Sequence, residues 1–224
     1  MKVTFLGQAG LLFEDNDTKI LVDPYLSNSV EKFNSNNYRR QPINKKYLNI
    51  KPNVIIITHN HLDHLDDETL QNYLNKSSNV LCLAPYSSWQ KLRNFKGNNN
   101  YVMFNNGTSW TYKNIKFQAV KAEHSDLEAI GIIIICNNET HYITGDTLYN
   151  ELVFKSLPDI KINYLYLPIN GVGNNMNIED AANFANRINA DIVIPIHFGM
   201  FDNINANDFK IENKIIPEIY RRII

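Results

Sequence analysis

The stretch Val54-Ile55-Ile56-Ile57-Thr58-His59-Asn60-His61-Leu62-Asp63-His64 determines how this sequence folds and where its chemistry lies. Its first half is a continuous apolar run, which is typical of a strand buried on both faces. Its second half follows the expected strand directly, and the carboxyl ends of such strands are where open α/β sheets collect their sites. We therefore expect the polar half to form part of a binding or catalytic site.

The polar half carries an unusual density of metal-binding side chains. It holds three histidines and an aspartate, although the chain of 224 residues has only six histidines in all. Side chains alternate along an extended chain, so His59, His61 and Asp63 can project to one side, and His64 supplies an adjacent position. Imidazole and carboxylate ligands suit zinc, manganese or iron. The alternative, a surface turn that happens to hold histidines, is disfavoured by this density.

The order of apolar runs predicts two sheets rather than one. A β-meander is expected over 3–6, 10–14 and 19–22, with a hairpin turn at 15–17. Further strands are expected at 80–84, 101–104, 115–122, 130–136, 141–144, 164–167 and 192–196. Helices are expected at 66–74, 86–95, 148–155, 178–188 and 215–224. Strands that come first alone and then alternate with helices predict an α/β sandwich of four layers. No linker divides the chain, so residues 1–224 are expected to form a single domain.

One long segment has no regular pattern. Residues 25–51 are polar and rich in Asn and Ser, with Arg39 and Arg40 near their middle. Irregular insertions of this length are either functional or without structure. Two interpretations stay open, a lid over the site and a solvated loop with no role.

The net charge and the lengths of the apolar runs argue against some classes of function. A net charge of -1 gives no reason to expect nucleic acid or an anionic membrane as a partner. No run approaches the ~20 apolar residues that span a bilayer, so we expect a cytoplasmic protein that acts on a small molecule. A homo-oligomer is compatible with the sequence. Cys82 and Cys136 lie in apolar runs and are expected to be buried thiols. His141 matches no motif and is expected at the surface.

The motif His59-Asn60-His61-Leu62-Asp63-His64 resembles the His-x-His-x-Asp-His signature of metallo-β-lactamase-fold hydrolases. This resemblance implies an αβ/βα sandwich with a two-metal site along one edge. It also implies later ligands in the order His, Asp, His, each after a strand. His124, Asp146 and His197 follow expected strands in that order, so the resemblance covers nearly the whole chain.

The resemblance assigns a role to each position. Three histidines would hold one divalent ion, namely His59, His61 and His124. Asp63, His64 and His197 would hold the other, and Asp146 would bridge the two. Zn²⁺ and Mn²⁺ are the expected ions, and they would share a hydroxide that attacks the substrate. Asp63 and Asp146 would position that hydroxide and shuttle its proton, and Asp23 would support a ligand imidazole from behind.

One position favours hydrolysis over redox chemistry. Oxygen-reducing di-iron relatives of this fold carry glutamate where this chain has His61. A nucleophilic pair of Ser125 and His124 is a weaker alternative, because neighbours on a strand point to opposite faces.

Several stretches are similar to the L-ascorbate-6-phosphate lactonase group of the same superfamily. They are residues 6–10, 22–27 and 195–201, together with Asn170-Gly171. This similarity implies the ring-opening hydrolysis of a phosphorylated sugar lactone. Arg39 and Arg40 are then candidates to hold the phosphate, with a solvated basic turn as the alternative, and Asn170 is a candidate substrate contact.

Three other functions remain open. A phosphodiesterase or nuclease of the same superfamily would need a basic surface, which the charge balance does not favour. A thioester hydrolase of the glyoxalase II type would need a Gly-His pattern that residues 170–177 lack. A metal-binding protein without turnover is disfavoured by the complete set of seven ligands.

Overall fold

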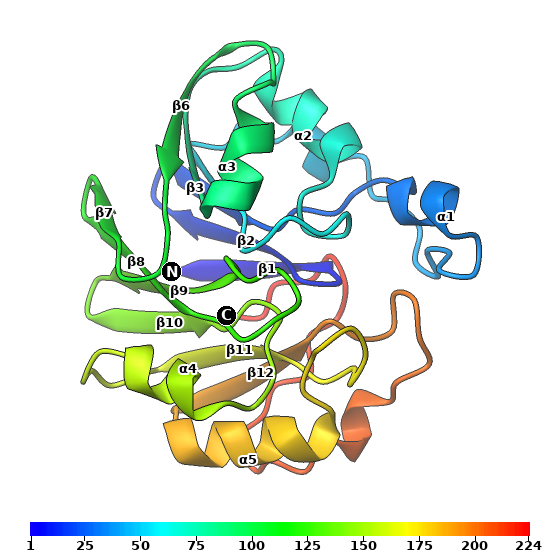
Figure 1. The fold of residues 1–224 in the computed structure, drawn as a ribbon, viewed down its shortest axis with the longest axis vertical. Coiled ribbons are helices and arrows are strands. Elements are labelled where there is room, and N and C mark those ends of the chain that lie inside the picture. The colour runs from blue at the N-terminus through cyan, green and yellow to red at the C-terminus, as the bar shows by residue number, and fades with distance from the viewer.

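Two six-stranded sheets pack face to face in the computed structural model of this chain, which describes all residues from 1 to 224 (Figure 1). The first sheet runs in chain order through β1 (Lys2–Gly7), β2 (Gly10–Asp15), β3 (Thr18–Val22), β4 (Val54–Ile56), β5 (Ser78–Ala84) and β6 (Asn98–Met103). The second holds β7 (Ser109–Tyr112), β8 (Ile115–Lys121), β9 (Ile130–Cys136), β10 (Glu139–Ile143), β11 (Tyr164–Pro168) and β12 (Ile192–Ile196). The predicted four-layer α/β sandwich is confirmed.

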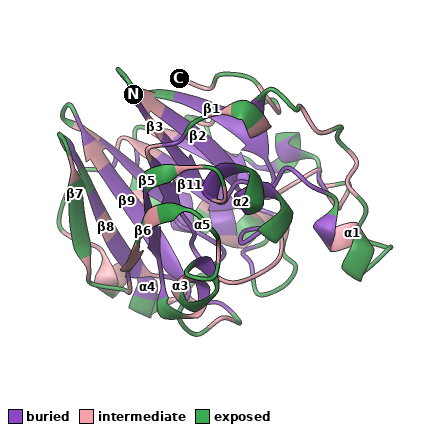
Figure 2. Ribbon diagram, turned by 90° about the horizontal axis from the view of Figure 1, so that it is seen from above, coloured by how far each residue is buried: buried purple, intermediate pink, exposed green.

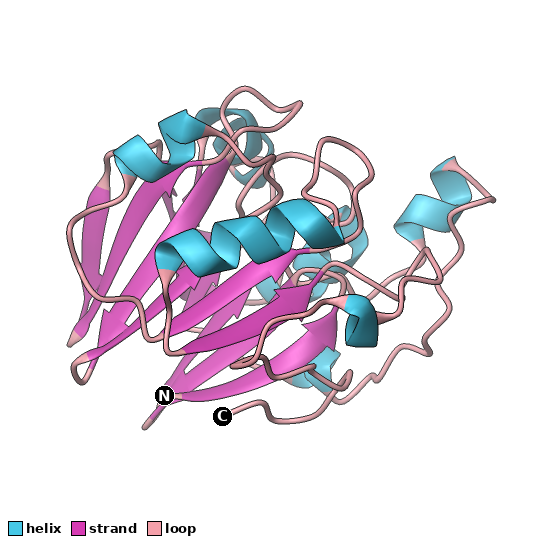
Figure 3. Cartoon of the chain, turned by 90° about the horizontal axis from the view of Figure 1, so that it is seen from below, coloured by secondary structure: helices cyan, strands magenta, loops and turns pink.

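Helices cover the outer faces of the two sheets. The helices α2 (Asp67–Leu74) and α3 (Tyr86–Leu92) lie on the first sheet, and α4 (Glu151–Ser156) and α5 (Ile178–Ile188) lie on the second (Figures 1 and 3). A short helix, α1 (Ser29–Phe33), stands away from the sheets, and two single-turn helices are η1 (Tyr47–Asn49) and η2 (Ala206–Asp208). None of these helices is both long and apolar enough to cross a bilayer.

Burial follows the alternation of side chains along each strand (Figure 2). Val54 and Ile56 of β4 join the 23-residue core between the sheets, whereas Ile55 and Ile57 join the cluster under α2 and α3. Such a strand has no solvent-facing side, which is why its sequence is apolar without interruption. Both cysteines are free and buried, as expected.

The C-terminal segment is extended, so the helix predicted for 215–224 was wrong. The backbone N–H of Tyr220 donates to the Phe5 carbonyl at 2.7 Å, and that of Ile223 donates to the Val3 carbonyl at 2.8 Å. Pro217 disfavours a helix here, and the edge of β1 offers hydrogen bonds that a helix would leave unused. The segment therefore covers the open edge of the first sheet.

Two further expectations need correction. His141 is fully buried on β10, where its Nδ1 lies 3.2 Å from the Tyr166 hydroxyl and its ring packs edge-on against Phe13 at 5.3 Å. His141 and Ile143 lie two residues apart and therefore point to the same face of β10, which is an interior strand of the second sheet. The edge strand β7 was not predicted, because its exposed, mixed sequence carries no apolar period.

Candidate metal centre

The site lies where loops leave the carboxyl ends of strands in both sheets. Strands β3 and β4 are parallel to one another, and so are β10, β11 and β12. β8 runs in the same direction as β10, because each pairs antiparallel with β9. The segments after these strands therefore meet at one edge of the sandwich, which is where the predicted residues lie.

The structure brings all seven predicted ligands together. Their ligand atoms form three overlapping groups, each within 4.8 Å: His59, His61 and His124; His59, His64 and Asp146; and Asp63, His64 and His197. Asp146 lies between the two halves, with Oδ1 3.3 Å from His64 Nε2 and Oδ2 3.1 Å from His197 Nε2. Asp63 Oδ2 lies 3.3 Å from His197 Nε2. Two of the three groups have the same members as the ligand sets implied by the resemblance, and Asp146 lies in the third group with His59 and His64.

Unusual backbone conformations turn these side chains inward. Asp23 and His197 have positive φ angles of 43° and 56°, which are costly for residues with a Cβ. Gly145, just before Asp146, has φ of 65°, and a Cβ there would lie 2.6 Å from the Ile130 carbonyl oxygen. Only glycine fits at this position, so the sequence Gly145-Asp146 is set by the approach of β10 to β9.

Asp23 anchors two of the histidines from behind. Its carboxylate accepts the Thr58 N–H at 2.8 Å, the Thr58 hydroxyl at 2.6 Å and His64 Nδ1 at 2.8 Å. The Thr58 hydroxyl donates its proton to Asp23. The Thr58 Oγ1 atom can therefore accept a hydrogen bond from His59 Nδ1 at 3.0 Å. Both imidazoles are thereby held with Nδ1 protonated and Nε2 turned toward the centre.

The inward nitrogens are suited to a metal. His59 Nε2 is buried and has no hydrogen-bond partner, an arrangement that is costly unless another group satisfies it. His64 Nε2 is buried as well, and its contact is the ion pair with Asp146 Oδ1 at 3.3 Å. His124 Nδ1 is held by the Asn174 carbonyl at 3.1 Å, and its Nε2 faces His61 Nδ1 at 3.1 Å. Imidazole and carboxylate donors at this spacing fit zinc or manganese.

The pKa values of the histidines and of Asp146 also favour a site that binds a cation. Burial lowers the pKa of His59 well below its ordinary value and also lowers the pKa of His124, so both imidazoles are neutral at neutral pH. Burial acts against the charged form of His197 too, but the carboxylates of Asp146 and Asp63 outweigh it and raise its pKa to about 10. The pKa of Asp146 lies well below its ordinary value, because the imidazoles of His197 and His64 overcome the effect of burial. A proton holds the place of a cation here, and an ion that binds would displace it.

A cavity of about 380 Å³ opens onto this centre, a size that fits small-molecule sites. Beyond the ligands, its lining includes amides, apolar side chains and one further carboxylate: Gln8, Val30, Asn37, Asn170, Val172, Asn175, Phe201 and Asp202. The segment 25–51 therefore contributes Val30 and Asn37 to the wall. Its role as a lid stays a prediction.

The arginines predicted to bind phosphate lie outside the lining. Arg39 donates to the Tyr25 carbonyl at 3.0 Å and to the Tyr220 hydroxyl at 2.9 Å, and its guanidinium stacks over the Tyr25 ring. It ties the segment 25–51 to the C-terminal segment. The guanidinium of Arg40 lies over the Tyr38 ring at 5.0 Å. Neither guanidinium is among the residues that line the cavity, and the role of these arginines in phosphate binding stays a prediction.

Two residues of the site escaped prediction. Gln8 follows β1, and its Nε2 donates to Asp63 Oδ2 at 2.8 Å. Asn175 Nδ2 donates to Asp146 Oδ2 at 2.8 Å. An isolated amide in a turn gives no signal in one sequence. The nucleophilic pair does not form, because Ser125 Oγ lies 3.3 Å from His61 Nε2 and contacts that ring instead of His124.

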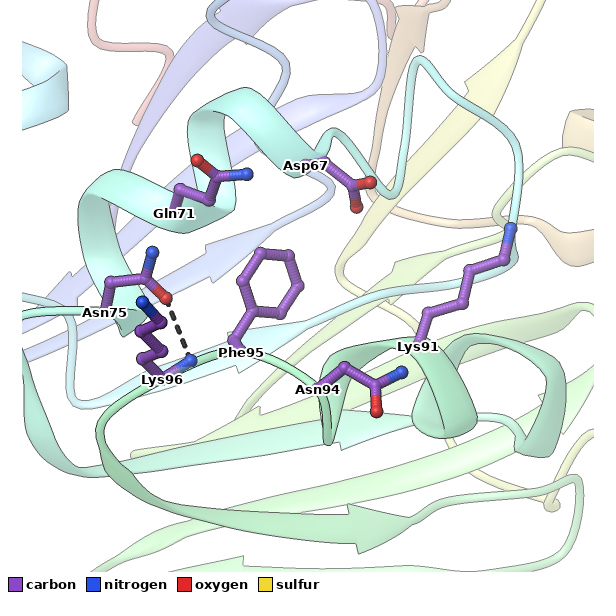
Figure 4. A pocket seen from close by; sticks show the side chains of 7 residues that line it. All are labelled: Asp67, Gln71, Asn75, Lys91, Asn94, Phe95 and Lys96. Atoms are coloured by element: carbon purple, nitrogen blue, oxygen red, sulfur yellow. Dashed lines mark hydrogen bonds between the residues drawn. The ribbon is translucent and has the colours of Figure 1, made fainter.

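A second cavity of about 470 Å³ lies between α2 and α3 (Figure 4). Its walls are polar and hold Asp67, Lys91 and Lys96, but none of the seven metal-ligand candidates. Without converging donors it offers no comparable chemistry.

Comparison with known proteins agrees with this geometry. The sequence profile of the family described as Beta-lactamase superfamily domain matches residues 2–197. A UPF0173 metal-dependent hydrolase of Flavobacterium johnsoniae is 31% identical over 219 residues, covering 92% of this chain and 88% of that protein. Another of Staphylococcus carnosus is 28% identical, covering 94% of this chain and 91% of that protein. The crystal structure of a protein from Parabacteroides distasonis, described there as a putative metal-dependent hydrolase, superposes with a TM-score of 0.74 at 26% identity, covering 97% of this chain and 92% of that one.

Proposed function

The chain belongs to the β-lactamase superfamily and is a metal-dependent hydrolase, and from this premise we propose that it cleaves a lactone or ester at a two-metal centre. One observation carries the proposal. Seven imidazole and carboxylate side chains from distant segments converge, and the inward nitrogen of His59 is buried without a partner.

The ligand groups divide between two ions of the zinc or manganese type. His59, His61 and His124 would hold one, and Asp63, His64 and His197 the other, with Asp146 between them. Two such ions, when bound, would lower the pKa of a shared water toward about 7 and polarise the carbonyl oxygen of the lactone or ester.

The protein's own groups then orient the reaction. Asp63 and Asp146 each keep a carboxylate oxygen beside the cavity, where they can orient the attacking water and accept its proton. Gln8 and Asn175 hold these carboxylates by hydrogen bonds, so that neither rotates away. Asp23 and Thr58 hold Nδ1 of His64 and His59, so that Nε2 is the nitrogen each ring would offer to an ion.

An acyl substrate fits the cavity better than a phosphodiester. No lysine or arginine is among the residues that line it, whereas sites for phosphate chains and nucleic acid rely on cationic side chains. We propose that the ester bond of the predicted sugar lactone is the substrate feature recognised, and that a small molecule is the partner.

The test compares metal-stripped protein with protein reloaded with zinc or manganese. Substrates are δ-valerolactone, p-nitrophenyl acetate and bis(p-nitrophenyl) phosphate. We expect the lactone and ester to be hydrolysed only by reloaded protein. Equal rates in stripped and reloaded samples would refute the metal-dependent mechanism. Faster metal-dependent cleavage of the phosphodiester would favour the phosphodiesterase alternative.

A further inference from the structure

The most exposed large apolar side chains of the chain belong to segments around the cavity. Phe33 and Leu127 are 88% exposed and Val172 is 68% exposed, whereas no other exceeds 51%. Val172 itself lines the cavity, and Phe33 follows the lining residue Val30 on α1. Leu127 follows the lining residue Ser125 in the loop after β8. Single exposed apolar residues are ordinary, but a group of them around one cavity indicates a surface that binds an apolar group.

Phe33 and Val30 share one face of α1, the helix that stands away from the sheets (Figure 1). Residues three positions apart lie on the same side of a helix, so Phe33 extends outward the wall that Val30 begins inside the cavity. Lys32 lies about 200° around the helix from Val30 and pairs with Glu68 of α2 at 2.6 Å. This contact holds the opposite side of α1 and leaves the Val30–Phe33 face toward the cavity.

Val172 lies at the tip of a tight loop after β11. The residues on either side of it, Gly171 and Gly173, have φ angles of 65° and 69°, a left-handed conformation that glycine adopts without strain. The loop is closed at its base, where the Gly171 N–H donates to the Met176 carbonyl at 3.0 Å. Val172 belongs to none of the three hydrophobic clusters of the core. Its side chain therefore has an apolar surface that the fold itself does not use.

Phe201 completes the apolar part of the cavity wall. Val30, Val172 and Phe201 are the apolar side chains among the residues that line the cavity. The Phe201 ring packs edge-on against the buried Tyr25 ring at 5.7 Å, so it offers a fixed surface. We name these three residues together with Phe33 the apolar strip. The strip begins inside the cavity that opens onto the metal centre and ends outside it, on α1.

We infer that the apolar strip binds an alkyl tail of the substrate, so that the site prefers a lactone with such a tail over one without. The substrate is the occupant because the strip is continuous with the cavity beside the candidate ligands. A tail on the strip removes exposed apolar side chains from water, which favours binding. This inference rests on the proposed function, and it names the substrate class of that site as alkyl-bearing lactones.

The first experiment compares δ-valerolactone with δ-decalactone, which has the same ring and a pentyl chain, on zinc-loaded protein. Each kcat/KM is divided by the rate constant of alkaline hydrolysis, which corrects for the reactivity of the ring. Burial of one methylene group is worth about fourfold in affinity. A pentyl chain that is about half covered should therefore raise the corrected kcat/KM about tenfold or more. Equal corrected values, or a preference for δ-valerolactone, would overturn the inference.

The second experiment shortens the strip at two places. Phe33 and Val172 are exposed and belong to no core cluster, so Phe33→Ser and Val172→Ser should leave the fold intact. We expect each substitution to lower the ratio of kcat/KM for δ-decalactone to that for δ-valerolactone about three- to fivefold, because part of the tail loses its apolar contact. A ratio within the error of the wild type in either variant would contradict the inference.

The control variant is Leu152→Ser. Leu152 is 51% exposed on α4, which covers the outer face of the second sheet, and it is not among the residues that line the cavity. This substitution should leave both lactone rates at wild-type values. An equal fall of the ratio in Leu152→Ser would show that the loss of any exposed apolar residue suffices, and it would overturn the inference. The ratio of two substrates measured on one sample is independent of the fraction of folded or metal-loaded protein.

The same variants exclude two other occupants of the strip. If the protein floats with phosphatidylcholine vesicles and Phe33→Ser does not, the strip binds a lipid surface. If the protein sediments as a dimer that Phe33→Ser dissociates, the strip binds a second copy of the chain. Either result would overturn the inference, and we expect neither.

A binding measurement separates the failure of the inference from that of the proposed function. If zinc-loaded protein hydrolyses neither lactone, the proposed function fails. Calorimetry with the ring-opened forms, 5-hydroxydecanoate and 5-hydroxypentanoate, then still decides the role of the strip. Tighter binding of 5-hydroxydecanoate that weakens in Phe33→Ser supports the inference. Equal binding of the two acids, or an advantage that Phe33→Ser leaves unchanged, overturns it.

Discussion

Replacing Asp23 with asparagine should weaken metal binding although Asp23 is not a predicted ligand. The side chain is buried, and its Oδ2 accepts both the Thr58 hydroxyl at 2.6 Å and His64 Nδ1 at 2.8 Å. In Asp23→Asn an NH₂ group takes the place of one oxygen. If it faces His64, the imidazole can pair with it only by moving its own proton from Nδ1 to Nε2. That nitrogen then cannot bind an ion.

The opposite orientation of the new amide is also unfavourable. Its NH₂ group would face the Thr58 backbone N–H, which now donates to Asp23 Oδ1 at 2.8 Å. The substitution therefore either turns His64 Nε2 into a donor or removes the partner of the Thr58 N–H. Loss of a supporting partner of this kind typically lowers metal affinity about 10- to 100-fold, or about 1.4 to 2.7 kcal/mol. We expect a loss in that range for the ion next to His64.

Zinc affinity is measured by competition with a chromophoric chelator, in parallel with urea unfolding of the metal-free protein. The matched control is Asp66→Asn. Asp66 is equally buried and accepts hydrogen bonds from Ser27 at 2.9 Å and from Thr69, but it contacts no candidate ligand. Zinc affinity of Asp23→Asn within twofold of the wild type would refute the reasoning. So would an equal loss in Asp66→Asn, because general destabilisation would then account for it.

The remaining predictions concern folding and metal stoichiometry. Burial lowers the pKa of His141 to about 4, so the neutral ring stabilises the fold at neutral pH and this stability is lost as pH falls from 6.5 toward 4. In urea unfolding of metal-free protein, His141→Phe should lose about 2 kcal/mol less stability than the wild type between pH 7 and pH 5, and equal losses would contradict this. Gly145→Ala should destabilise the protein by about 2 kcal/mol or more and weaken zinc binding, because its Cβ meets the Ile130 carbonyl. Gly173→Ala has a similar φ but open space, so an equal effect there would show that the clash is irrelevant. His61→Ala should reduce bound zinc below two ions per chain by elemental analysis, and unchanged stoichiometry would exclude its ligand role.

Local sequence pattern was sufficient for the layers and for the ligand candidates at 59–64, whereas His124, Asp146 and His197 became candidates only through the resemblance to metallo-β-lactamase-fold hydrolases. The run at 54–57 is apolar because β4 is covered on both faces, and that run places His59–His64 at a strand end. The helix over 178–188 was predicted to its bounds, because Asn177 caps its start with a hydrogen bond to Asp180 N and Asn189 ends it in a left-handed conformation. Each of these signals lies within a few residues, where period and capping act.

Contacts between residues that are far apart in the sequence could not be predicted from the sequence alone. Gln8 and Asp63 are 55 positions apart, and only the packing of β1 beside the site makes that amide part of it. Arg39 is basic in the sequence, but the Tyr220 hydroxyl, 181 positions away, fixes where its charge lies. The same holds for the tail, whose apolar residues suit a helix until the edge of β1 offers it hydrogen bonds. Short-range propensity decides which elements form, whereas the pairing of polar groups is settled only when those elements pack.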